Sequence, residues 1–139
     1  MLTTIQAVDN VVESAKTAKK ATRVWDTNIL APVARQGDVY LRRLPLEAEF
    51  AREMKLAETR QIAPGDTPGS RHVLNEGPQI FNFTDAGPLE GPVIRAPEGF
   101  YLSHPTHGDI DCRLPGTYVV TFPVDKRAEE LGEIRRRRD

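Results

Sequence analysis

The sequence has little of the material from which oxidised or membrane-spanning proteins are built. Only one cysteine, Cys112, occurs in 139 residues, so an intrachain disulfide is excluded and the chain suits a reducing compartment. Aromatic residues make up only 6% of the chain, and a core must therefore consist mainly of Val, Ile, Leu and Ala. No run of about 18 apolar residues is present, which argues against a membrane-spanning helix.

The chain also has almost no net charge that could attract a charged partner. Nineteen basic residues against twenty acidic ones give a net charge of −1, so no overall field attracts nucleic acid or an anionic membrane. Residues 1–6 have neither a basic region nor an apolar stretch typical of a secretory signal. We therefore expect a cytoplasmic or virion location, with neither a membrane nor a nucleic acid as partner.

Turn-forming residues are plentiful. Eleven prolines and ten glycines favour short strands joined by tight turns over a helical bundle. The length corresponds to one domain. The fold is predicted to be mainly β, a small sandwich or barrel over residues 36–125, with strands at 39–42, 71–75, 79–83, 92–96, 100–104, 108–112 and 117–122.

The clearest helical pattern precedes this domain, at residues 3–22. Its apolar side chains recur at three- and four-residue spacing on one narrow stripe. Thr3 and Gln6 fit a capping box at its start. Because the stripe contains only Val and Ala, the helix is expected to be marginal alone and to need a surface to lie on. The stripe consists of Val8, Val11, Val12, Ala15 and Ala18.

An extended connector is predicted at residues 24–33, since Pro32 disfavours helical geometry at the residue before it. Trp25, Ile29 and Leu30 make the connector unusually apolar, so we expect it to dock on its own domain or on a neighbouring one. Residues 1–35 are thus interpreted as a helical arm and connector that grip another protein chain. The partner-binding residues predicted are Val8, Val11, Val12, Ala15, Trp25, Ile29 and Leu30.

Two further segments are predicted, a second helix and a charged tail. Leu46, Phe50 and Met54 recur every four residues, which predicts a second helix between residues 45 and 60. Residues 126–139 are predicted to be a charged tail ending in four arginines, Arg135 to Arg138.

Three histidines are the only concentration of residues that commonly bind metals. His104 and His107 are three apart, and His72 could supply a third imidazole from another strand, as in a cupin-type metal centre. Pro105 and Gly108 place the His104–His107 pair in a turn instead of on one strand face. We therefore expect turn and surface histidines and no metal, with His72, His104 and His107 as the ligands if a metal is bound.

Two stretches carry a resemblance to known sequences. One is Arg71-His72-Val73-Leu74-Asn75-Glu76-Gly77. The other is His104-Pro105-Thr106-His107-Gly108-Asp109-Ile110, which leads into Leu114-Pro115-Gly116-Thr117-Tyr118-Val119-Val120. They resemble small uncharacterised bacterial and phage-encoded β proteins with an Arg-His-x-Leu turn and a His-Gly…Leu-Pro-Gly-x-Tyr hairpin. The likeness covers about a third of the chain and implies fold-setting turns, with no site residues to carry over.

These observations favour a non-enzymatic structural or assembly protein without a cofactor. We expect it to form a homo-oligomer and to dock on the protein subunits of a larger particle, with a phage capsid cement or decoration protein as the specific case. One alternative is a cupin-like metal-binding protein, which would allow a metal-dependent enzyme. Another is a small regulatory module that binds nucleic acid through Arg135 to Arg138.

Overall fold

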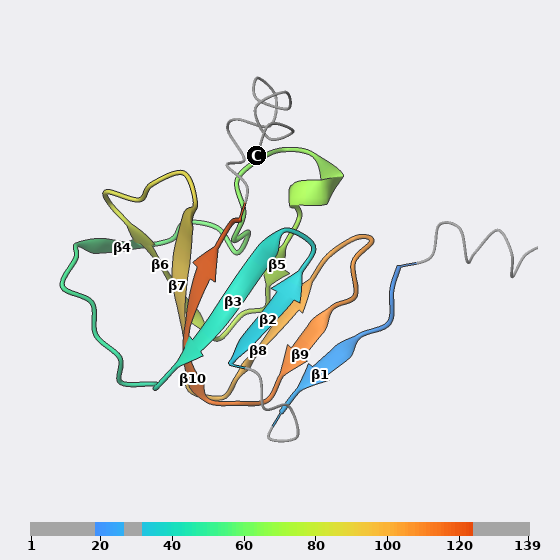
Figure 1. The fold of residues 1–139 in the computed structure, drawn as a ribbon, viewed down its shortest axis with the longest axis horizontal. Helices are drawn as coiled ribbons and strands as arrows, with labels where there is room; N and C mark the ends of the chain where they lie inside the picture. Colours follow the sequence, from blue (N-terminus) through green and yellow to red (C-terminus); the bar gives the residue numbers. More distant parts are fainter. Residues whose placement is uncertain (1–18, 27–31, 124–139) are drawn as a thin grey trace, which may run out of the picture.

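The computed structural model describes residues 19–26 and 32–123, and these form two β-sheets. The smaller sheet has the order β1-β9-β8-β5. Its strands are β1 (Arg23–Trp25), β9 (Ile110–Cys112), β8 (Phe100–Ser103) and β5 (Val73–Leu74). β1 runs parallel to β9, whereas the other neighbours in this sheet are antiparallel (Figure 1).

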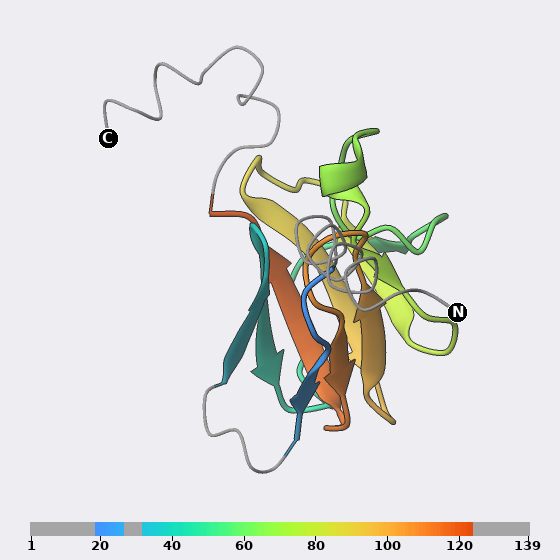
Figure 2. The same ribbon diagram turned by 90° about the vertical axis from the view of Figure 1, so that its right-hand side faces the viewer.

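The larger sheet has the order β2-β3-β10-β7-β6-β4, and every pairing in it is antiparallel. Its strands are β2 (Val33–Gln36), β3 (Val39–Leu44), β10 (Gly116–Thr121), β7 (Glu90–Ala96), β6 (Gln79–Phe83) and β4 (Met54–Leu56). One 3₁₀ turn, η1 (Pro68–Ser70), precedes β5. Seen after a 90° turn, the two sheets face each other (Figure 2). The mainly β, sandwich-like prediction is thus confirmed.

The core lies between the two sheets, and aromatic rings from both meet in it. Trp25 of β1 is only 2% exposed. Its ring makes edge-to-face contacts with Phe100 of β8 and Tyr118 of β10, at centroid distances of 6.4 and 5.3 Å. Such contacts add to the hydrophobic gain of burying large rings. Trp25 therefore joins the smaller sheet to the larger one.

The predicted helix between residues 45 and 60 is wrong. Residues 45–53 contain no regular element, and Met54–Leu56 forms the edge strand β4, which pairs with β6. Backbone carbonyls that a helix would use accept other bonds: Leu46 from the Thr117 hydroxyl at 2.7 Å, and Ala48 from the Arg95 guanidinium at 2.7 Å. Tertiary bonds and the pairing with β6 outweigh the four-residue spacing of the apolar side chains.

The predicted arm and connector also need correction. Residues 3–18 of the predicted helix and residues 27–31 of the connector lie outside the described residues. Residues 19–22 are not helical, and β1 follows them. Because β1 and β2 each pair with strands of the two sheets, the β domain includes residues from before the predicted boundary at 35.

All seven predicted strands are present, with ends shifted by at most a few residues. The strands not predicted are β1, β2 and β4, which are three or four residues long and lie at sheet edges. Among the described helical segments, none is long and apolar enough to cross a membrane.

Candidate functional site

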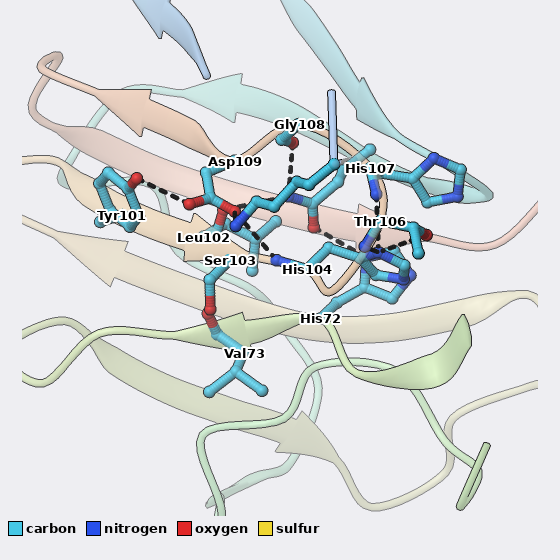
Figure 3. Close-up of polar contacts among 12 residues, drawn as sticks. His72, Val73, Tyr101, Leu102, Ser103, His104, Thr106, His107, Gly108 and Asp109 are labelled. Atoms are coloured by element: carbon cyan, nitrogen blue, oxygen red, sulfur yellow. Dashed lines mark hydrogen bonds and ion pairs between the residues drawn. The ribbon is translucent and has the colours of Figure 1, made fainter. Parts of the chain in front are cut away.

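The three histidines meet at one end of the two sheets (Figure 3). His72 lies just before β5, and His104 and His107 lie in the loop of residues 104–109 that joins β8 to β9. The ring of His104 is 4.4 Å from that of His72 and 4.5 Å from that of His107, between centroids. The three residues that the sequence marked as a concentration of metal-ligand types therefore lie together, and we call them the histidine cluster. The expectation of surface histidines is wrong for His72 and His104, which are buried.

His104 organises the β8–β9 loop from inside. Its Nδ1 accepts the backbone N–H groups of Thr106 and His107, at 3.1 and 3.0 Å, so Nδ1 carries no proton. Its Nε2 lies 3.0 Å from the carbonyl oxygen of Gly69 and donates to it. His104 is thus the neutral Nε2–H tautomer, with both ring nitrogens bonded to backbone groups.

His72 is fully buried and is oriented by Gln36, the last residue of β2. The Gln36 amide nitrogen donates to the carbonyl oxygens of Leu102 and Gly108, each at 3.0 Å. The Gln36 Oε1 must then accept, and it lies 2.8 Å from Nδ1 of His72, so Nδ1 carries a proton. The other ring nitrogen, Nε2, faces the carboxylate of Asp38 at 3.6 Å.

Asp109 closes the other end of the loop. It accepts from Lys19 at 2.6 Å, from the Tyr101 hydroxyl at 2.7 Å and from the backbone N–H of His104 at 3.1 Å. Burial opposes the charge on Asp109, but these bonds outweigh burial and lower the pKa of its carboxyl below the usual value. Asp109 is therefore an anchor held in its ionised form.

The segment before β1 lies directly against this loop. The backbone N–H of Lys20 donates to the backbone carbonyl oxygen of Thr106 at 3.0 Å. The backbone N–H of Arg23 donates to the backbone carbonyl oxygen of Asp109 at 2.9 Å. A Cβ on Gly108 would lie 2.1 Å from the carbonyl oxygen of Ala21, so only glycine allows this approach. The loop thus fixes the entry of the chain into β1.

A three-imidazole metal centre does not fit these contacts well. A ligand needs a lone pair pointing at the metal, and His104 has already committed Nδ1 and Nε2 to protein bonds. Among the residues that the structure describes, no group of three or more His, Cys, Asp and Glu side chains is arranged to hold a metal ion. The arrangement supports a structural role for the histidine cluster.

Cys112 is likewise enclosed. It is buried, and its sulfur lies 3.0 Å from the hydroxyl of Tyr118. Burial raises the pKa of the Cys112 thiol, which disfavours the nucleophilic thiolate. The Tyr118 hydroxyl in turn donates to the backbone carbonyl oxygen of Leu114.

The predicted partner-binding residues have different outcomes. Val8, Val11, Val12, Ala15, Ile29 and Leu30 lie outside the described residues, as do Arg135 to Arg138. Trp25 does not fit the prediction that it binds a partner, because its ring is buried in the core of its own domain and has no surface left for another chain. Its exposed neighbour on β1 is Val24, at 38%.

Sequence reasoning missed the residues that orient the histidines. These residues are Gln36, Asp38 and Lys19, and none of them belongs to a motif that the sequence singled out. One available signal was the turn Gln36-Gly37-Asp38, in which two polar side chains flank a glycine between β2 and β3.

No curated protein and no solved structure matches the chain significantly. A family model described as "Domain of unknown function (DUF8820)" matches residues 35–122, which include all strands from β3 to β10. Since this match covers more than half of the chain, the protein belongs to the DUF8820 family.

Proposed function

We propose that this protein is a non-enzymatic structural or assembly protein whose N-terminal segment, residues 1–18, binds another protein subunit. The observation that carries the proposal is the anchoring of the residues that follow this segment. Lys19 is paired with Asp109 at 2.6 Å, Lys20 is bonded to Thr106, and Trp25 is buried in the core. A partner that holds residues 1–18 would therefore be connected firmly to the β domain.

The chemistry of the histidine cluster supports a role without catalysis. His104 and Gln36 use their polar atoms to hold the β8–β9 loop, and Asp109 holds Lys19. General acid–base catalysis requires a group that can exchange its proton with a substrate, and these groups are engaged with the protein. The cluster serves to attach the N-terminal residues.

The partner in this proposal is a protein subunit, and the protein itself is a homo-oligomer. The apolar stripe of Val8, Val11, Val12 and Ala15 is the surface that we assign to the contact. A phage capsid to which the protein binds as a cement or decoration subunit is the specific assembly proposed.

Native mass measurement of the full-length protein beside a variant that lacks residues 1–18 tests the proposal. A deletion of residues 1–35 would not serve, because it removes Trp25 and β1 and nearly all of β2. The full-length protein is expected to be oligomeric and the shortened protein to be a folded monomer. If the shortened protein keeps the mass of the full-length assembly, the proposal is wrong.

Substitutions in the full-length chain provide a matched comparison. Val8→Asp with Val12→Asp places two charges on the predicted stripe and should abolish assembly. Asn10→Asp with Thr17→Asp adds the same charge on the opposite side of the predicted helix and should leave assembly intact. Equal loss in both pairs would indicate a general charge effect and would contradict the assigned surface.

A further inference from the structure

A hollow of about 380 Å³ lies where the residues before β1 approach the turn between β2 and β3. It is lined by Lys20, Arg23, Arg35 and His107, together with Ala21, Gly37 and Gly108. We propose that this hollow is a binding site for a tetrahedral dianion, namely a phosphoryl or sulfate group. The proposal uses residues other than the apolar stripe and does not depend on the assembly function.

The charges around the hollow are all of one sign. Every ionisable side chain among the described residues that line it is basic. Two carboxylates on neighbouring segments face other groups: Asp109 pairs with Lys19 at 2.6 Å, and Asp38 faces His72 at 3.6 Å. An anion in the hollow would therefore meet an excess of positive charge.

The titration of His107 reflects this excess. Burial lowers the pKa of its imidazole, and the neighbouring imidazole of His104 and the positive charges of Lys20 and Arg23 lower it further, while Asp38 acts in the opposite direction. Bringing a dianion into the hollow would reverse this repulsion and favour the protonated ring.

Both guanidinium groups are held in place before any ligand arrives. Arg35 donates from Nε to the carbonyl oxygen of Gly37 at 2.5 Å, and its guanidinium lies 5.5 Å from the ring centroid of Tyr40. Arg23 donates from Nη2 to the carbonyl oxygen of Arg35. An arginine has five N–H donors, and within the described residues the outer pair of nitrogens of Arg35 makes no bond. Preorganised donors of this kind favour oxyanions, because little side-chain entropy is lost on binding.

The geometry suits a single small anion better than a nucleic acid. Lys20, Arg23, Arg35 and His107 are the basic side chains, and all of them line one hollow. A nucleic acid presents its phosphates at successive points and is bound through many such contacts. We therefore commit to an isolated phosphoryl or sulfate group.

The test is a titration of the ¹⁵N-labelled full-length protein with sodium sulfate, followed by amide chemical shifts, with sodium chloride adjusted to keep the ionic strength constant. Saturable shifts are expected at Lys20, Gly37, His107 and Gly108. Arg35→Gln should weaken the affinity about tenfold or more, since a hydrogen bond to a charged group is lost. Lys20→Gln is the second variant, because no hydrogen bond of its side chain holds the described fold, and it too should weaken binding.

Arg42→Gln is the matched control, since it removes the same charge from an exposed arginine of β3 that does not line the hollow. It should leave the sulfate affinity unchanged. Shifts that rise without saturation, or an affinity equal in Lys20→Gln and the unaltered protein, would overturn the proposal.

The pH dependence of the sulfate affinity shows how much protonated His107 contributes to binding. Sulfate keeps its double charge at neutral pH, so a gain in affinity as the pH falls reports on His107 and should disappear in His107→Gln. Inorganic phosphate is expected to compete with sulfate for the same amides. If an oligonucleotide binds while neither free anion binds or competes with it, the surface recognises polyanions and the proposed single-anion site is wrong.

Discussion

The amide of Gln36 and the imidazole of His72 fix each other's orientation. Gln36 belongs to the larger sheet, yet its amide nitrogen bonds to the carbonyl oxygens of Leu102 and Gly108 beside the smaller one. Its Oε1 then lies 2.8 Å from His72 Nδ1. One buried side chain thus connects β2, β8, the β8–β9 loop and the residue before β5.

Gln36→Leu should therefore be strongly destabilising. It would leave the N–H of His72 and two carbonyl oxygens without their amide partner, and each such buried group costs about 1–3 kcal/mol. We expect a loss of about 2–5 kcal/mol in the free energy of unfolding, measured by urea denaturation. Gln79→Leu, at an exposed position of β6, is the control and should change it by about 0.5 kcal/mol or less. Equal effects would show that the Gln36 bonds contribute nothing.

Trp25→Ala tests whether β1 is part of the folded core. Removing a buried aromatic side chain typically costs about 3–5 kcal/mol, and we expect a loss of this size in the urea-derived free energy of unfolding. Val24→Ala changes the exposed neighbour on the same strand and should have a small effect. A Trp25→Ala protein as stable as the unaltered one would place the indole outside the core.

Gly99 should not tolerate a side chain. Its φ is +83°, and an added Cβ would lie 2.1 Å from the carbonyl oxygen of Cys112. Gly77 also has a positive φ, +117°, but its Cβ would meet no atom within 4 Å. Gly77→Ala is expected to cost about 1 kcal/mol from backbone strain, and Gly99→Ala at least about 2 kcal/mol more because the clash adds to the strain. Thermal unfolding of both variants measures the difference, and equal losses would contradict the clash.

The Arg52–Glu90 pair predicts a pH dependence of stability. Arg52 donates to Glu90 at 2.5 Å, and the Gly87 N–H donates to Glu90 at 2.9 Å. These bonds lower the pKa of Glu90 from 4.5 to about 2. Because the folded-state pKa is depressed, the stabilisation is complete above pH 4.5 and is lost as the pH falls towards about 2.

Glu90→Gln should accordingly flatten the dependence of the urea midpoint on pH across this acidic range. The Glu90 side chain is 40% exposed, so solvent screens the pair and the change should be about 1 kcal/mol or less. Glu98→Gln alters an exposed glutamate and should keep the original slope. An unchanged slope in Glu90→Gln would refute the assignment.

The histidine cluster gives a prediction about metal content. Since both ring nitrogens of His104 are bonded to backbone groups, protein purified without chelator should carry no stoichiometric metal in elemental analysis. Stoichiometric metal in the unaltered protein that is absent from His104→Ala would instead support the cupin-like alternative.

The sequence predicted the long strands because their signals are local. Gly116–Thr121 is rich in β-branched residues and is bounded by proline, and the structure has β10 there. The helix between residues 45 and 60 was predicted wrongly because the four-residue spacing of Leu46, Phe50 and Met54 also suits an irregular segment along a sheet edge. Phe50 packs edge-to-face on Phe83 at 5.8 Å, a contact between residues far apart in the sequence.

The site was predicted only in its residue types. His72, His104 and His107 stood out by composition, but their roles depend on Gln36 and on the carbonyl of Gly69. No local pattern links these residues, since the sheets bring them together. Trp25 was missed as a core residue for the same reason, because its partner strand β9 lies near the other end of the domain.

The parallel pairing of β1 with β9 determines when this domain can be completed during synthesis. Arg23 pairs with Ile110 and Trp25 with Cys112, so one of the first strands made waits for one of the last. Until residues 110–118 leave the ribosome, the indole lacks both its partner strand β9 and the ring of Tyr118, so the unfinished chain carries an exposed tryptophan. Closing such a long loop is slow compared with forming local hairpins. We therefore expect the pairing of β1 with β9 to be a late step of folding. Until that step, the exposed ring of Trp25 makes the unfinished chain prone to aggregation.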